Sequence, residues 1–139
     1  MLLRGHAGLT RRMDATLREL HGLNLNEFEV LLQLRNAEGG RLRRVDLSQR
    51  LVITQGGITR LLAGLESEGL VERQGCKTDA RVVYACITKP GEQKLAAARE
   101  AHLDDVRRLF SDRFDATELE QLAGLLSRLD PGGDAPDSC

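Results

Sequence analysis

The segment from Asp79 to Gly91 constrains the fold of this 139-residue chain more than any other. It begins ten residues after Gly69, which ends a helical pattern. The apolar run at residues 82–87 indicates a strand, and the Thr-Lys-Pro sequence at residues 88–90 indicates the start of a new helix. A helix, a β-hairpin and another helix in this order predict a wing with Arg81 at its tip. This arrangement beside a helix-turn-helix is typical of proteins that read DNA.

The composition favours one mainly helical domain. The chain is rich in Leu, Ala and Arg, and it has three Phe, one Tyr and no Trp, so its core must be built from aliphatic side chains. Residues 41–94 hold ten basic and six acidic side chains, whereas residues 95–139 hold five and ten. The basic middle therefore predicts contact with a polyanion, although the whole chain has a net charge of −1.

Local signals predict the remaining elements. A helical stripe covers residues 7–20 and ends at Gly22, and residues 41–43 suit a small edge strand. Capping boxes are predicted from Asn24 with Glu27 and from Asp115 with Glu118, each opening a helix. Two short helices, about 45–51 and 55–68, should follow the edge strand, with Thr54 as the N-cap of the second, and a long helix should cover about 89–110.

The second short helix has two different faces. Its core-facing residues follow helical spacing and are Ile58, Leu61, Leu62 and Leu65. Its opposite face carries small and charged residues, namely Gly56, Thr59, Arg60 and Ala63. Such a face suits the major groove, and two glycines in the first turn allow the backbone to approach a phosphate. The alternative is an ordinary solvated helix face.

The first, long and last helices flank the basic middle, and each carries an apolar stripe. A domain of this size leaves little core for three such helices, so we expect a two-fold homodimer, with a monomer core as the alternative. The predicted fold is mainly α with a small β-hairpin wing: a winged helix-turn-helix at 24–88 with dimerisation helices at 1–20 and 89–130. Residues 131–139 read as a disordered tail.

Several spaced motifs resemble the MarR family of transcriptional regulators over residues 7–130. The family signature is met by Asp79, Arg81, Thr88 and Gly91, and Ala85 and Ile87 are conservative replacements within it. The resemblance implies one MarR-type domain (residues 1–130), a homodimer and usually a repressor, with Arg81 in the minor groove oriented by Asp79. Ala80 departs from the pattern, since many members have a second Arg there, which puts affinity or site preference in doubt.

We expect the basic middle to contact double-stranded DNA. Thr59 and Arg60 are predicted to contact the major groove or phosphate, Gln55 a phosphate or an adenine, and Lys77 and Arg73 phosphates. The full set of predicted contact residues is Thr54, Gln55, Gly56, Gly57, Thr59, Arg60, Arg73, Lys77, Asp79 and Arg81.

The resemblance also implies release of DNA by a small phenolic or anionic aromatic effector, bound between the dimerisation helices and the winged module. Arg12 and His21 are the candidate effector-binding residues, because Arg can pair with a carboxylate. The alternatives are a helix C-terminal cap for His21 and a surface charge for Arg12.

Two other functions stay open. Cys76 and Cys86 allow a thiol-based redox regulator. The hairpin register should keep the two cysteines from pairing with each other. The alternative is that Cys76 is an incidental surface thiol. The winged helix also suits protein–protein contact.

The sequence argues against several other classes of function. The histidines are scattered, so we expect no metal site, and catalytic motifs are absent, so we expect the protein not to be an enzyme and to need no cofactor. Three cysteines without CxxC spacing and no apolar leader predict a soluble, reduced, cytoplasmic protein.

Overall fold

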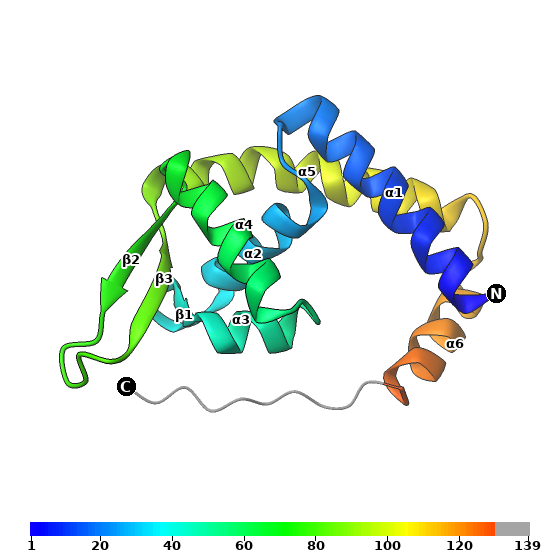
Figure 1. The fold of residues 1–139 in the computed structure, drawn as a ribbon. Helices are drawn as coiled ribbons and strands as arrows, with labels where there is room; N and C mark the ends of the chain where they lie inside the picture. Colours follow the sequence, from blue (N-terminus) through cyan, green and yellow to red (C-terminus); the bar gives the residue numbers. More distant parts are fainter. Residues whose placement is uncertain (130–139) are drawn as a thin grey trace.

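A computed structural model describes residues 1–129 of the chain (Figure 1). The predicted tail at 131–139 lies outside the described residues. The fold is mainly helical with a small antiparallel sheet, as predicted. Its elements in chain order are α1 (Leu2–His21), α2 (Leu25–Asn36), a short 3-10 turn (Glu38–Gly40), β1 (Arg41–Arg43), α3 (Arg44–Arg50), α4 (Gln55–Ser67), β2 (Val71–Gly75), β3 (Val83–Ile87), α5 (Lys89–Ser111) and α6 (Ala116–Ser127).

The long helix α5 connects the two ends of the molecule (Figure 1). The wing formed by β2 and β3 lies at its first end, and α6 follows its last end. Helix α1 packs along α5, whereas α2, α3 and α4 form a compact group beside the sheet. The segment from α2 to β3, which we call the winged module, is thus separated from α6 by the length of α5.

Helix α1 is longer than the sequence predicts, since it begins at Leu2 rather than near residue 7. No N-terminal capping side chain marks this start, and Gly5 and His6 interrupt the apolar stripe used for the prediction. The predicted end is confirmed, because Gly22 adopts a left-handed conformation (φ 65°) and donates its N–H to the carbonyl of Arg18.

The predicted helix starts are confirmed by their capping hydrogen bonds. Asn24 accepts from the N–H of Glu27 at 2.8 Å, and Glu27 accepts from the N–H of Asn24 at 2.9 Å. Asp115 and Glu118 form the same reciprocal pair at the start of α6. The hydroxyl of Thr54 caps α4 by accepting from the N–H of Gly57. These local signals set the helix starts independently of the packing around them.

The sheet has the strand order β1-β3-β2, and both pairings are antiparallel. Strand β1 is the predicted edge strand, with Leu42 opposite Ala85. In the wing, Val71 pairs with Ile87 and Gly75 pairs with Val83. Strand β2 therefore ends at Gly75 and strand β3 begins at Val83, so that residues 76–82 form the hairpin tip.

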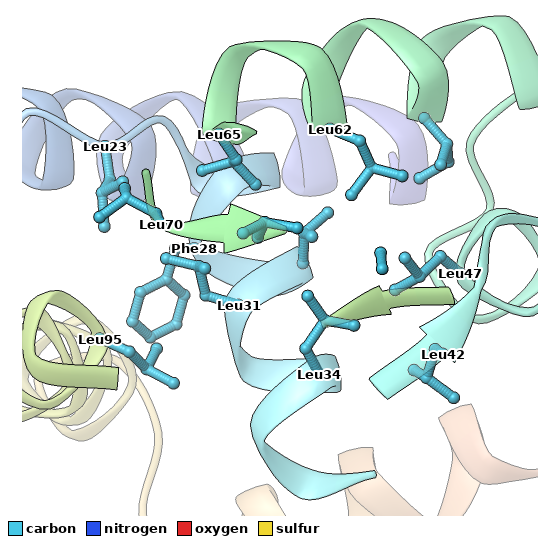
Figure 2. Packing of buried hydrophobic residues seen from close by; sticks show 14 of the residues in the cluster. Leu23, Phe28, Leu31, Leu34, Leu42, Leu47, Leu62, Leu65, Leu70 and Leu95 are labelled. Carbon is cyan, nitrogen blue, oxygen red and sulfur yellow. The ribbon is translucent and has the colours of Figure 1, made fainter. Parts of the chain in front are cut away.

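The core of the winged module is built from aliphatic side chains around one aromatic ring (Figure 2). Phe28 of α2 lies among residues from α4, α5 and the sheet, and its side chain is 2% exposed. The predicted core face of α4 is confirmed by buried Ile58, Leu62 and Leu65, with Leu61 packed at the margin. This packing fixes α4 with its opposite face outward.

The start of α5 is tied to the turn that follows α4. The hydroxyl of Thr88 donates to the carbonyl of Gly69 at 2.7 Å, and the N–H of Thr88 donates to the carbonyl of Leu70 at 3.1 Å. A Cβ at Gly91 would lie 2.1 Å from the same Leu70 oxygen, so only glycine fits there. This close junction fixes α5 relative to the end of α4 and the base of the wing.

Candidate nucleic-acid interface

Helix α4 presents the outward face that the sequence predicts. Gln55, Gly56 and Arg60 are exposed, and Thr59 is half-buried. The Thr54 hydroxyl is engaged in capping, so its side chain serves the helix start directly. The exposed face therefore presents the guanidinium of Arg60 and the side-chain amide of Gln55 to solvent.

The two glycines of the first turn of α4 have different surroundings. A Cβ at Gly57 would lie 2.7 Å from the Ile53 side chain, so packing within the chain itself explains this glycine. A Cβ at Gly56 would meet no atom within 4 Å. Only Gly56 therefore faces open space where a phosphate can approach the backbone.

The wing holds Arg81 in a defined but exposed position. The N–H of Arg81 donates to Asp79 Oδ1 at 3.0 Å, and its Nε lies 3.4 Å from the same oxygen. The Arg81 side chain is 92% exposed, so this surface ion pair orients the arginine without burying it. Asp79 and Arg81 are thus brought together as the sequence predicts.

A cleft of about 320 Å³ separates α4 from the wing. Its walls come from the start of α3, from α4 and from both wing strands. Of the predicted site residues it includes Gln55, Thr59, Arg73 and Arg81. Arg60 and Lys77 are exposed outside the cleft, on α4 and at the wing tip.

Two cleft arginines, Arg43 and Arg44, were missed by sequence reasoning. Arg43 donates from Nε and Nη2 to the two carboxylate oxygens of Asp46, at 2.8 and 3.1 Å, and Asp46 is buried. Arg44 donates from Nη1 to the Thr59 hydroxyl at 3.3 Å. The local sequence Arg43-Arg44 gave no helix-start signal, and the Thr59 contact joins residues far apart in the chain.

Arg73 is held by helix α4. Its Nε donates to Glu66 Oε1 at 2.8 Å, and Glu66 raises the pKa of Arg73 above its ordinary value. This pair joins β2 to α4 across the cleft. The charge of Arg73 is consequently balanced by a carboxylate within the protein.

The cysteines require one correction. Cys76 is buried (8% exposed) rather than an incidental surface residue. Its N–H donates to the carbonyl of Val82, which folds the hairpin tip back. The side chain of Cys76 packs against Val82, Tyr84 and Cys86. Cys86 is a free cysteine, so the expectation that the two do not pair is confirmed. Burial raises the pKa of the Cys86 thiol, which lowers its reactivity at neutral pH.

The two candidate effector-binding residues do not converge in this chain. Arg12 is exposed and His21 is half-buried at the last turn of α1. They are nine positions apart in the helix, which places their side chains on opposite faces of α1 and roughly 13–14 Å apart along its axis. A single pocket that uses both residues is therefore absent from residues 1–129.

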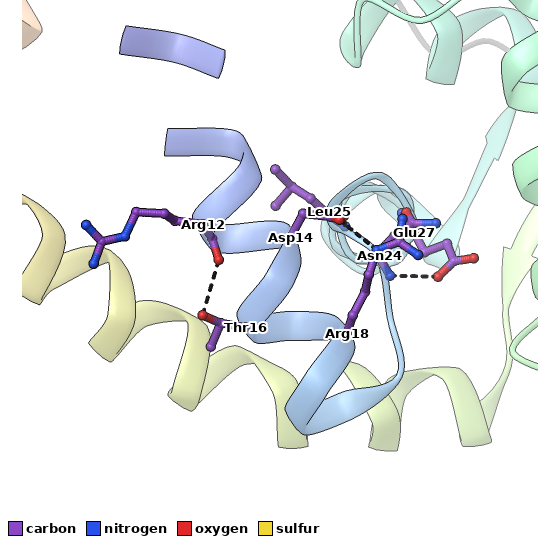
Figure 3. Close-up of polar contacts among 7 residues, drawn as sticks. All are labelled: Arg12, Asp14, Thr16, Arg18, Asn24, Leu25 and Glu27. Carbon is purple, nitrogen blue, oxygen red and sulfur yellow. Dashed lines mark hydrogen bonds and ion pairs between the residues drawn. The ribbon is translucent and has the colours of Figure 1, made fainter. Parts of the chain in front are cut away.

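The side-chain contact that joins α1 to α2 is made by Asp14 (Figure 3). Asp14 accepts from the N–H of Leu25 at 2.8 Å and from Arg18 Nε at 2.6 Å. The Leu25 hydrogen bond, more than Arg18, lowers the pKa of Asp14. Asp14 thereby fixes α1 against the start of the winged module.

Neither a metal site nor a membrane-spanning helix is found in the part of the chain that the structure describes. No group of three or more His, Cys, Asp or Glu residues is placed to hold a metal ion. No helix there combines the length and the apolar character needed to cross a bilayer.

Comparison with known proteins identifies the family. The MarR family model matches residues 21–82. An uncharacterised HTH-type transcriptional regulator of Bacillus cereus is 32% identical over 107 residues, which is 77% of this chain and 69% of the relative.

Solved structures share the same fold. The MarR family transcriptional regulator AbsC of Streptomyces coelicolor superposes with a TM-score of 0.84 at 28% identity, over 91% of this chain and 85% of AbsC. Sco3205 of the same organism, solved in complex with DNA, gives a TM-score of 0.87 at 25% identity, over 92% and 80% of the two chains. This chain therefore belongs to the MarR family of winged helix-turn-helix transcriptional regulators, which bind DNA.

Proposed function

We propose that this protein is a dimeric repressor that binds a pseudo-palindromic operator and is released from it by a small effector. The observation that carries the proposal is the common cleft between α4 and the wing. Gln55 and Thr59 of α4 line one side of it, and Arg81 of the wing lines the other. In this arrangement α4 can bind the major groove while Arg81 binds the adjacent minor groove of the same duplex.

Within this proposal five of the predicted residues contact DNA. Arg60 and Gln55 are exposed on α4 and contact base edges or phosphates in the major groove. Arg81 enters the minor groove, where its charge favours the narrow A·T-rich form. Lys77 at the wing tip and the open backbone at Gly56 contact phosphates, which position the protein without specifying sequence.

Dimerisation would use the apolar surface at the ends of the chain. No residue of α6 is buried, and Leu125, Leu126 and Leu129 are 59%, 43% and 69% exposed. Leu2 and Leu3 at the start of α1 are exposed as well. A two-fold partner that covers these leucines would place two α4 helices ~34–36 Å apart, one turn of DNA.

The effector would be a phenolic or anionic aromatic compound held between the dimerisation helices and the winged module. Arg12 and His21 stay the candidate contacts, acting from separate places on α1 or from different subunits. Operator release by a carboxylated aromatic probe such as salicylate, weakened in the Arg12→Ala variant, would support this part of the proposal.

The decisive variant is Arg81→Ala. We expect its affinity for a selected operator to fall by about 1–3 kcal/mol, while its secondary structure and dimer stay intact, because Arg81 is exposed and contributes little to the fold. Fluorescence anisotropy with operator and scrambled duplexes measures this. Lys77→Ala is the matched control: it should weaken binding to both duplexes equally. Unchanged operator affinity in Arg81→Ala would overturn the role of the wing.

A further inference from the structure

The cleft between α4 and the wing holds four arginines, and their charges are not equivalent. Arg43 is paired with the buried Asp46, Arg73 with Glu66, and Arg81 with Asp79. Arg44 differs: among residues 1–129, no carboxylate lies within ion-pair distance of it, and its hydrogen bond goes to the uncharged Thr59 hydroxyl. Arg44 is therefore the cleft cation whose charge is uncompensated within the described chain.

Thr59 has little hydrogen-bonding capacity left for a base. Its hydroxyl donates its single proton to the carbonyl of Gln55 at 2.9 Å and accepts from Arg44 Nη1 at 3.3 Å. The residue is half-buried at the cleft wall rather than exposed like Arg60. The hydroxyl is thus used to hold the Arg44 guanidinium against α4.

We propose that Arg44 binds a backbone phosphate of DNA in this cleft and that Thr59 is a positioning residue for Arg44 rather than a base-contacting residue. The inference rests on the proposed function. When α4 lies in a major groove and Arg81 in the adjacent minor groove, the strand that separates the two grooves passes between them. Its phosphodiesters then face the cleft, where Arg44 supplies a charge that its neighbours do not neutralise.

This assignment explains the arrangement of the other three arginines. Their carboxylate partners brace the cleft: Asp46 holds Arg43 at the start of α3, and Glu66 holds Arg73 so that β2 stays fixed to α4. Four uncompensated guanidiniums in one cleft would repel one another, whereas three pairs and one free charge do not. The result is a preorganised place for a single anion.

The first test is the salt dependence of DNA binding by Arg44→Ala. We expect affinity to fall about tenfold or more on operator and scrambled duplexes alike, because a charge-assisted contact to phosphate is lost. The slope of log K against log salt should become shallower by about 0.9, the value for one phosphate. Arg50→Ala, an exposed arginine at the other end of α3 and outside the cleft, is the charge-matched control and should retain the wild-type slope.

The second test separates positioning from base contact. If Thr59 acts through Arg44, Thr59→Val should weaken binding to both duplexes, and Thr59→Ser should bind as the wild type does. The Arg44→Ala/Thr59→Val double variant should bind no more weakly than Arg44→Ala alone. Additive losses, or a changed preference at one base pair in Thr59→Val, would overturn the role of Thr59. An unchanged salt slope in Arg44→Ala would overturn the phosphate site while leaving the proposed function intact. Failure of the wild-type protein to bind any duplex would instead reject the proposed function, and this inference with it.

Discussion

Helix α2 of the winged module and the last helix, α6, are both rich in leucine, but α2 is buried and α6 is exposed. In α2, Phe28, Leu31 and Leu34 are at most 2% exposed. In α6, which is also 12 residues long, no side chain is buried. Both helices begin with a complete capping box. The difference therefore does not come from helix formation.

What differs is whether the chain itself supplies a surface for the apolar stripe. Helix α2 is enclosed by α4, α5 and the sheet, so its side chains close a core within one chain. Helix α6 follows the far end of α5, and its leucines meet no comparable partner among residues 1–129. We infer that the winged module draws its stability from its own core, whereas α6 gains stability from association.

The largest expected effect is on the core of the winged module. Replacing Phe28 with Ala should lower the free energy of unfolding by about 3–5 kcal/mol, because it removes a buried aromatic ring and leaves a cavity. Urea unfolding followed by circular dichroism at low protein concentration measures the loss.

The matched control is Phe114→Ala at the opposite end of the molecule. Phe114 follows α5 and is 38% exposed, with Phe110 as its ring neighbour at 6.3 Å. We expect a loss below about 1 kcal/mol, since a half-exposed ring leaves no sealed cavity. Equal losses for the two phenylalanines would contradict the distinction between the two regions.

A smaller and different effect is expected at α6. Leu126→Glu should weaken the proposed dimer by at least tenfold, or about 1.4 kcal/mol, because a charge replaces an apolar side chain that we assign to the interface. The unfolding free energy of the monomer should change little, since Leu126 is 43% exposed in the single chain.

Sedimentation equilibrium over a range of concentrations tests this prediction. Val52→Glu is the control, because Val52 is exposed on the winged module and outside the predicted dimer surface. A monomeric wild-type protein, or equal dimer affinity in the two variants, would show that the exposed leucines of α6 do not form the interface.

The sequence predicted those features that depend on neighbouring residues. The capping pairs at Asn24 and Asp115, the helix end at Gly22 and the pairing of Asp79 with Arg81 are all short-range, and the structure contains each of them. Their chemistry is complete within a few residues, so packing elsewhere does not alter it.

The features that sequence reasoning missed depend on residues far apart in the chain. Arg44 becomes a site candidate only because α3 places it against Thr59, fifteen residues later. Gly57 has a packing reason that spacing does not show, since a Cβ there would lie 2.7 Å from the Ile53 side chain. Cys76 looked exposed at a hairpin tip, but the tip folds back over it. Such contacts need coordinates, because spacing along the chain does not encode them.

The smallest predicted effect lies where α5 packs against the winged module. The ring of His102 in α5 packs against the ring of Phe28 in α2, tilted by 50° with the centroids 4.6 Å apart. Burial lowers the pKa of His102 below its ordinary value of 6.5, and the nearby Asp105 opposes this only in part. The unfolded chain therefore binds more protons than the folded chain at mildly acidic pH. Stability from this site is complete above the unfolded pKa and is lost as pH falls through the folded pKa.

We expect the contribution of His102 to the stability of the wild-type protein to be slightly smaller at about pH 5.5 than at about pH 7.5, and the His102→Gln variant to lack this difference. Glu29 acts in the opposite sense: burial raises its pKa, so its contribution is present at low pH and lost as pH rises through the folded value. Only the difference between wild type and His102→Gln isolates the histidine, because Glu29 is common to both. Parallel pH profiles for the two proteins would mean that protonated His102 is tolerated beside Phe28, and that this junction transmits no pH dependence between α5 and the winged module.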